Sequence, residues 1–274
     1  MPTYTTLLIP SSLPEESLTL LAHKLRIFKL HALLSDPNAF SQSHATESLL
    51  PLSAWEARVA NPNFRTVVCI VDDGGERDGL SRGGGKDEGP NSCEVDGKRM
   101  TVQRLVAAEW VGTFTLVGPV ARETWLCPLS GQPAPAANGA ETRWHLTSLF
   151  VLPEHRGRGL AAKLTLAAVR AGSFASIALS KGTGNQGADG SVGAPTRFRL
   201  IVHPKNKSVV GLYEKMGFVV GGVYTQREAM AAMGDAAGIP SGAEGEKWDT
   251  RLAIGMECLI WVETEGERRI LDEK

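Results

Sequence analysis

The sequence VLPEHRGRGLAAKL, residues 151–164, carries the clearest structural signal in the chain. An apolar, strand-like run meets a proline, and arginines then alternate with glycines before an apolar helix begins. The first amides of a helix have no intrahelical partner, and the helix dipole makes them attractive to anions. Gly157 and Gly159 allow a ligand to approach the backbone closely, and Arg156 and Arg158 add positive charge. The segment therefore predicts an anion site, suited to a pyrophosphate, where the strand becomes a helix.

The turn alone leaves several interpretations open. The letters GRGLAA fit the dinucleotide pattern G-x-G-x-x-A, but a Rossmann unit needs an acidic residue about twenty positions later. The corresponding region, FASIALSKGTG, contains no acid. The phosphate-binding pattern G-x-x-x-x-G-K-[ST] is absent from the chain. A tight turn with two surface arginines is the structural alternative to a ligand site.

A second motif narrows these alternatives. The sequence VHPKNKSVVGLYEKMGF, residues 202–218, follows another strand-like run and opens another helix. Together the two segments resemble the GNAT superfamily of N-acetyltransferases. The N-terminal stretch LRIFKLHALLSDPNAFSQSHATESLLPLSAWEARVANP also resembles the start of many small-molecule members of that superfamily. The first family motif, V-x-P-x-x-[RQ]-G-x-G-x-A, is met by Val151, Pro153, Arg156, Gly157, Gly159 and Ala161. The second, N-x-x-[SA]-x-x-x-Y-x-x-x-G-F, is met by Asn206, Tyr213, Gly217 and Phe218, with Ser208 or Val209 at the small position.

Hydrophobic periodicity predicts two helices, three strands, and then a helix, a strand, a helix and two final strands. The first expected element is the helix EESLTLLAHKLRIFKLHALLSDP. This order predicts an α+β (mixed α/β) fold. The resemblance implies that helices flank a central mixed and mostly antiparallel sheet. Together, the order and the resemblance imply a single N-acetyltransferase domain over residues 1–274.

Glycine-rich and polar composition predicts three flexible insertions and one variable loop. The insertions are expected at 74–101, 128–142 and 180–196, and the variable loop at 226–248. The first insertion is expected to separate two strands of a stretched hairpin, RTVVCIVDD and VQRLVAAEWVGTFTLVG.

The bulk composition is that of an ordinary soluble protein. The 274 residues are 42% hydrophobic and 22% charged, and their formal net charge is −1. This balance gives no electrostatic reason to expect nucleic acid or a membrane as a partner. No apolar run is expected to span a bilayer, and the N-terminal sequence does not resemble a secretory signal. The four cysteines and the scattered histidines lack metal-site spacing, so we expect no metal, reduced thiols and a cytoplasmic location.

The resemblance implies acetyl-CoA as the cofactor. Its pyrophosphate is expected on the turn formed by Arg156, Gly157, Arg158, Gly159, Leu160 and Ala161. The strand residues Leu149, Phe150 and Val151 are expected to bulge from the next strand and offer backbone groups to pantetheine. Asn206, Ser208 and Tyr213 complete the expected cofactor contacts. Core packing is the alternative role for Leu149 and Phe150, and helix N-capping is the alternative for Asn206.

The implied chemistry is direct attack of an amine on the thioester in a ternary complex. Tyr213 is the expected general acid for the departing thiolate, with a buried structural tyrosine as the alternative. The carboxylate that many relatives carry is missing, because Thr147 and Ser148 occupy its position. Glu109 and His145 are therefore the candidate catalytic bases, with Glu47 as a third candidate and free water as an alternative.

Phe40, Glu47 and Trp55 are the candidate residues of an acceptor pocket, although core packing is the alternative for both aromatics. The expected substrate is a primary amine of a small molecule, and the expected oligomeric state is a monomer or a homodimer. Two further functions stay open: acetylation of a protein or peptide, and a catalytically silent acyl-CoA-binding module.

Overall fold

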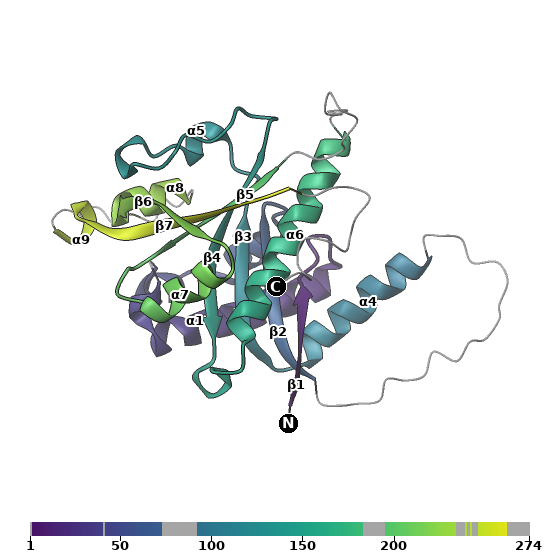
Figure 1. Ribbon diagram of the computed structural model, residues 1–274. Helices are drawn as coiled ribbons and strands as arrows, with labels where there is room; N and C mark the ends of the chain where they lie inside the picture. Colours follow the sequence, from purple (N-terminus) through teal and green to yellow (C-terminus); the bar gives the residue numbers. More distant parts are fainter. Residues whose placement is uncertain are drawn as a thin grey trace. The chain divides into compact units, whose positions relative to one another are not determined.

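The computed structural model describes residues 2–40, 42–72, 92–182, 195–233, 239, 242 and 246–261 (Figure 1). The chain divides into two compact units. Unit 1 comprises Met1–Pro37, His44–Phe114 and Leu149–Ala167, and unit 2 comprises Asn38–Ser43, Thr115–Ser148 and Ala168–Lys274. Strands β3 and β4 and helix α6 run from one unit into the other. The single domain expected over the whole chain stays a prediction.

Unit 1 combines two complete strands, four helices and parts of three shared elements. Its elements are β1 (Thr3–Leu8), α1 (Glu15–Ser35), α2 (His44–Ser48), α3 (Leu52–Ala60), β2 (Phe64–Asp72), α4 (Ser92–Ala107), the start of β3 (Trp110–Val117), the end of β4 (Thr142–Val151), the 3₁₀ turn η3 (Pro153–His155) and the start of α6 (Leu160–Gly182). Its strand order is β1-β2-β3-β4. Strand β1 pairs with β2 in antiparallel register, with Thr3 opposite Asp72 and Leu8 opposite Val67.

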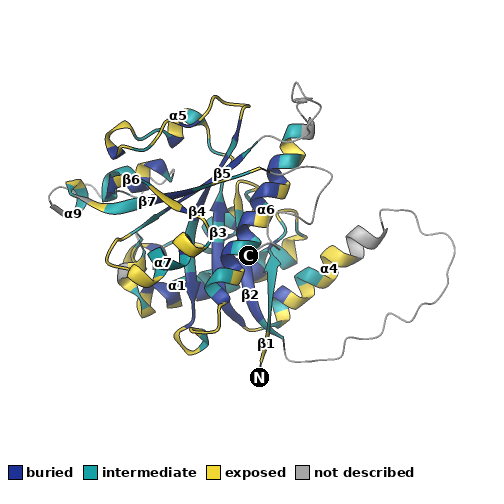
Figure 2. Ribbon diagram, viewed as in Figure 1, coloured by how far each residue is buried: buried dark blue, intermediate teal, exposed yellow. Residues whose placement is uncertain are grey.

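The core of unit 1 surrounds β2 and β3. Residues 67–70 of β2 are all buried, which is the pattern of a strand covered on both faces. Figure 2 shows this burial beside the mostly exposed helix α4. A Cβ on Gly112 of β3 would lie 2.8 Å from Leu164 of α6, so this glycine permits the helix to pack closely on the strand.

Unit 2 contains the other parts of β3, β4 and α6. Its own elements are α5 (Arg122–Trp125), the 3₁₀ turn η2 (Pro128–Ser130), β5 (Thr196–Val202), α7 (Lys207–Lys215), β6 (Val219–Thr225), α8 (Gln226–Ala232), α9 (Glu246–Asp249) and β7 (Arg251–Ile260); a further 3₁₀ turn, η1 (Pro37–Ala39), spans the boundary between the units. Its strand order is β3-β4-β5-β7-β6. Strand β4 pairs with β5 in parallel, whereas β5 and β6 each pair with β7 in antiparallel. The mixed, mostly antiparallel sheet and the α/β fold class are confirmed.

In the first half of the chain, two elements were not predicted and part of a third was assigned wrongly. Strand β1 precedes the first predicted helix, because the run TYTTLL has enough β-branched residues to pair along an edge. Short helix α2 was also not predicted. Residues 102–107, expected as strand, belong to α4, where Leu105 is fully buried and Arg104 donates to Asp72 over 2.5 Å. Their apolar residues fit a helical period as well as a strand.

The predicted insertions are more ordered than their composition suggests. The segment 128–142 contains η2 and a bridge between Asn138 and Glu141. Buried Arg143 orders this segment because its guanidinium needs acceptors, and the carbonyl of Ala137 accepts from it over 3.1 Å. Helices α4, α6 and α8 extend into the expected insertions 74–101 and 180–196 and the expected loop 226–248. Residues 74–91 and 183–194 lie outside the described residues.

Helix α6 contradicts one expectation about composition. Its segment Leu160–Ser180 has a mean hydropathy of 1.3, and by length and composition alone it is long and apolar enough to cross a membrane. Half of this segment is buried within the protein. The core helix of a soluble protein meets the same criterion, so the segment is weak support for a membrane span.

Candidate active site

The strand-to-helix turn of unit 1 has the geometry that its sequence predicts. Gly157 and Gly159 have φ angles of 75° and 73°, a region that residues with a Cβ rarely adopt. Both glycines are exposed, and no atom lies within 4 Å of the place where either Cβ would stand. Leu160 is buried and anchors the start of α6. The backbone of the turn is therefore open to a ligand at the N-terminus of a 23-residue helix.

The two arginines of this turn have different contacts. Arg156 donates from Nε to the carbonyl of Val151 over 2.9 Å, and its guanidinium lies over the ring of Phe150. Arg158 donates from Nη1 to the hydroxyl of Tyr4 over 2.7 Å. Tyr4 belongs to β1, so sequence analysis missed this partner together with the strand.

In unit 2, strands β4 and β5 pair over only part of their length. The parallel ladder runs from Thr142 opposite Thr196 to His145 opposite Arg199. Strand β5 continues to Val202 and stays paired with β7 to that point. Ser148, with φ 59°, is the only non-glycine residue with positive φ in the described part of the chain. The strands therefore diverge as predicted, but the irregularity lies one residue before the expected Leu149.

Candidate base His145 lies at the last pair before this divergence and is buried. It stacks on Trp125 at 4.7 Å, and its Nε2 lies 3.2 Å from Nη2 of Arg199. Burial and then the positive charge of Arg199 lower the pKa of His145 well below its ordinary value. The imidazole is therefore neutral, and it has the surroundings of a structural group.

Arg199 is also buried, but its acceptors among the described residues are neutral. Its Nη1 donates to the carbonyl of Trp125 over 2.8 Å and to Gln132 over 2.6 Å. The Tyr224 hydroxyl accepts from the same nitrogen over 3.2 Å, and the guanidinium lies 4.0 Å from the centre of the Trp125 ring. This cluster fixes the divergence point of β4 and β5.

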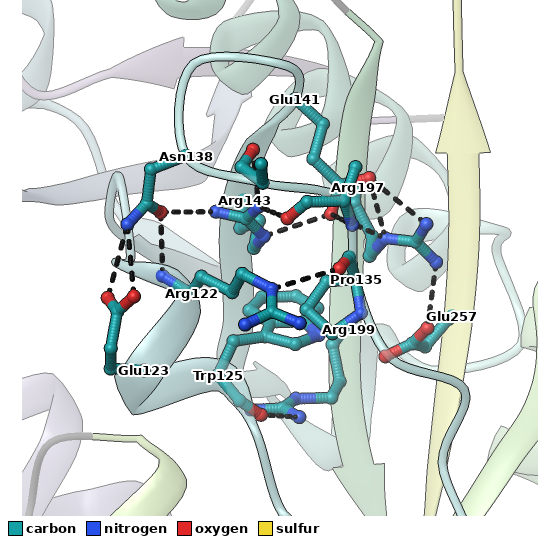
Figure 3. A network of polar contacts seen from close by, with 12 residues as sticks. Arg122, Glu123, Trp125, Pro135, Asn138, Glu141, Arg143, Arg197, Arg199 and Glu257 are labelled. Atoms are coloured by element: carbon teal, nitrogen blue, oxygen red, sulfur yellow. Dashed lines mark hydrogen bonds and ion pairs between the residues drawn. The ribbon is translucent and has the colours of Figure 1, made fainter.

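Four charged side chains, three buried and one half-buried, form a second network beside this cluster (Figure 3). Glu141 accepts from Arg143 over 2.9 Å and pairs with Arg197 over 3.0 Å. Arg197 also pairs with Glu257 over 3.1 Å, and burial raises the pKa of Glu257. The network ties the starts of β4 and β5 to the end of β7. The arginines in TRW and TRFR were the sequence signal for this network. They did not predict it, because charged residues on strands are usually exposed.

Candidate acid Tyr213 lies on α7 and is 3% exposed. Its ring packs against Phe218 at 5.5 Å, and its carbonyl accepts from the amide of that residue. Burial raises the pKa of Tyr213 above its ordinary value, so the phenol keeps its proton. Asn206 occupies the N-cap position of α7 without a side-chain capping bond, and it accepts instead from Ser208 over 3.2 Å.

The remaining candidates occupy three different settings. Glu109 was expected on a strand, but it is exposed and precedes β3, and its carbonyl accepts from the amide of Val71. Glu47 is buried and accepts from Arg58 through both carboxylate oxygens, over 2.5 and 3.1 Å. Trp55 is fully buried, and Arg58 lies over its ring. Phe40 is half-buried in the short segment Asn38–Ser43 of unit 2.

Comparisons with known proteins give one family match. Residues 131–220 match the model of the acetyltransferase (GNAT) domain. This range includes the glycine–arginine turn, the divergence of β4 and β5, and α7 with Tyr213. No curated protein sequence matches the chain.

Three solved structures illustrate the structural similarity. Arabidopsis thaliana NAA60 with a bisubstrate analogue is 14% identical over 94% of this chain and 98% of its own, with a TM-score of 0.43. Spermidine N-acetyltransferase from Vibrio cholerae with CoA and spermine is 12% identical over 93% and 95%, with a TM-score of 0.43. A putative acetyltransferase from Acinetobacter baylyi is 12% identical over 95% and 94%, with a TM-score of 0.47. Similarities of this size establish no substrate for this chain.

The family match covers both motifs identified in the sequence, in the same order along the chain. With the divergent strands and the open turn, it agrees with the mixed α/β fold. Residues 131–220 of the chain are therefore similar to a GNAT acetyltransferase domain.

Proposed function

We propose that the protein transfers the acetyl group of acetyl-CoA to a primary amine of a small molecule. The observation that carries this proposal is the turn Arg156–Ala161, where two exposed glycines with positive φ leave open space at a helix N-terminus. Such a turn suits a diphosphate, because free amides and the helix dipole favour negative charge there. CoA carries that group, and CoA or acetyl-CoA is bound in solved GNAT structures.

The chemistry needs no nucleophile from the protein. The amine nitrogen attacks the thioester carbonyl, and the C–S bond then breaks as the tetrahedral intermediate collapses. The sulfur takes the hydroxyl proton of Tyr213 as it leaves, and the new amide loses a proton to water. The Tyr213 phenolate regains a proton from solvent, which restores the acid for the next turnover. Holding both reactants together provides most of the rate gain expected of such a reaction.

The protonation state of Tyr213 supports its role as the acid. Burial raises its pKa, so the hydroxyl carries its proton at any physiological pH. A protonated phenol can donate to the sulfur as the C–S bond breaks. Because a thiolate is a weaker base than a phenolate, this transfer must accompany the bond cleavage and cannot follow it.

In this proposal water, and no side chain, accepts the proton of the amine. His145 is held in a buried cluster, and the Glu47 carboxylate is engaged by Arg58. Glu109 is exposed ahead of β3 and stays a prediction. An amine that arrives neutral needs no strong base before it attacks.

Binding and turnover of the full chain test the proposal in two steps. Calorimetry should first show binding of CoA and acetyl-CoA. Release of free thiol is then followed with a panel of small amines, a polyamine, amino acids and peptides with free N-termini, and mass spectrometry identifies the product. We expect turnover with small amines.

The other outcomes separate the alternatives. Turnover with peptides alone would replace the small-molecule acceptor by a protein or peptide. Binding of acetyl-CoA without turnover of any amine would support a silent acyl-CoA-binding module. Absence of CoA binding would overturn the proposed function. The cytoplasmic location and the monomeric or homodimeric state stay predictions.

A further inference from the structure

The two arginines of the glycine turn are held in different ways. Arg156 folds back on unit 1, where the carbonyl of Val151 accepts from it and the carboxylate of Asp36 lies 3.8 Å away. Arg158 contacts two neutral oxygens: the Tyr4 hydroxyl at 2.7 Å and the carbonyl of Glu154 at 3.4 Å. Among the described residues, no carboxylate lies within ion-pair distance of Arg158. The positive charge of the turn is therefore partly neutralised at Arg156 and fully retained at Arg158.

The position of Tyr4 follows from the alternation of β1. Thr3 and Thr5 donate their hydroxyls to the backbone carbonyl and the carboxylate of Asp72. Because neighbouring side chains of a strand point to opposite faces, Tyr4 points away from Asp72. Its ring meets His155 edge-on at 5.7 Å, and the Arg158 guanidinium lies 5.9 Å from its centre.

One hydroxyl joins two side chains of the turn. The Tyr4 oxygen accepts from Arg158 and lies 3.0 Å from Nδ1 of His155. Since the oxygen accepts from the guanidinium, its own hydrogen is available to Nδ1. Arg158 is thus exposed to solvent but fixed at one end, and a fixed cation loses less freedom when an anion binds.

We propose that Arg158 is the side chain of the turn that contacts the diphosphate of CoA, and that Tyr4 is its positioning residue. Arg156 instead fastens the turn to the end of β4. This inference rests on the proposed function, since the diphosphate is that of the proposed cofactor. It assigns a role in cofactor binding to the N-terminal strand, which carries neither family motif.

Calorimetry with CoA on the full chain tests whether Arg158 contacts the diphosphate and whether Tyr4 positions it. Arg158→Gln removes the charge and should raise the Kd for CoA at least tenfold. Tyr4→Phe keeps the ring and removes only the hydroxyl, and it should raise the Kd about three- to tenfold. Thr3→Val is the matched control, because it removes a hydroxyl of β1 that does not contact the turn. Its Kd should match that of the unmodified chain.

The double variant, Tyr4→Phe with Arg158→Gln, shows whether Tyr4 acts by positioning Arg158 or by a general effect on the structure. If Tyr4 acts through Arg158, Tyr4→Phe should add no further loss when Arg158→Gln is already present. In turnover, Tyr4→Phe should raise the KM for acetyl-CoA and leave kcat at saturating cofactor unchanged. Arg156→Gln should weaken binding less than Arg158→Gln and should lower the melting temperature more.

Each result has a separate meaning. If the unmodified chain does not bind CoA, the proposed function and this inference both fail. If the unmodified chain binds CoA and Tyr4→Phe binds it equally well, only this inference fails. Additive losses in the double variant would also overturn it, because Tyr4 would then act independently of Arg158. Circular dichroism melts of every variant identify any loss of Kd that comes from unfolding.

Discussion

Two positively charged regions of this molecule have opposite surroundings. The turn of unit 1 holds Arg156 and Arg158 at the surface, next to glycines with open space above their backbone. In unit 2, the charged network and the neighbouring cluster hold Arg143 and Arg199 in the interior. Carbonyls, a glutamine and a carboxylate accept hydrogen bonds from these two arginines. Both regions are rich in groups that catalysis commonly uses.

The two regions differ in how much of their hydrogen-bonding capacity remains available to a ligand. A buried ionised group must be satisfied by the protein itself, because an unpaired charge is costly away from water. Its bonding capacity is then used within the fold, and burial shifts the pKa of a neighbour such as His145. An exposed cation is hydrated until a ligand arrives and keeps its capacity for binding. Chemical type alone therefore does not separate a functional residue from a structural one here.

The largest expected effect tests whether the buried network is structural. Glu141→Ala leaves Arg143 and Arg197 without their shared carboxylate. We expect the free energy of unfolding to fall by about 3–5 kcal/mol, because an uncompensated buried charge remains. Urea denaturation measures this loss. Glu123→Ala removes an exposed carboxylate of helix α5 and should change stability by less than about 0.5 kcal/mol. Similar losses of unfolding free energy in both variants would mean that the buried carboxylate is no more important for stability than the exposed one.

The second prediction concerns chemistry at a buried group that is not part of the charged network. Tyr213→Phe keeps the ring that packs against Phe218 and removes the acid. We expect kcat to fall about a hundredfold or more, with little change in melting temperature. Burial raises the pKa of Tyr213, so its ionisation should not limit activity below about pH 10. Steady-state rates across pH measure both effects, and an unchanged kcat at every pH would remove Tyr213 as the acid.

The third prediction separates backbone strain from ligand contact in the open turn. Gly159→Ala and Gly131→Ala place a Cβ at nearly equal φ angles, 73° and 75°, and neither Cβ would meet an atom within 4 Å. Each should therefore cost about 1–2 kcal/mol of stability. Only Gly159→Ala should also weaken CoA binding, by about tenfold, or about 1.4 kcal/mol. Equal CoA affinities for the two variants, measured by calorimetry, would show that the ligand does not approach Gly159.

The smallest expected effect concerns pH and His145. The folded protein keeps this imidazole neutral, whereas the unfolded chain binds a proton there below about pH 6.5. Stability should therefore fall as pH drops below that value, by up to about 1.4 kcal/mol per pH unit. His145→Gln should lose less stability than the unmodified chain between pH 7 and pH 5. Parallel losses in urea titrations at both pH values would mean that His145 is not held neutral.

Sequence patterns predicted features whose residues lie close together along the chain. The glycine turn and helix α7 with Tyr213 follow from local residue choice, and the motif residue Gly217 follows that helix with a φ of 86°. Composition predicted the insertions less reliably than the motifs predicted the turn and helix α7. It predicted a flexible insertion at 128–142, although this segment is ordered by bonds to Arg143.

The sequence by itself determined the mixed α/β fold, the similarity of residues 131–220 to a GNAT domain, and the turn on which the proposed cofactor site is built. Short motifs can do this because they fix local backbone angles and helix starts. Only the tertiary structure decided which charged side chains are exposed and which are used in the fold. Tyr4 and Arg158 are 154 residues apart in sequence, and Trp125 and Arg199 are 74 apart. Contacts across such separations depend on how strands and loops pack, and no local pattern encodes them. For the same physical reason His145, a plausible base by its chemistry, lies inside a buried cluster, while Tyr4, which no motif marked, lies against the turn.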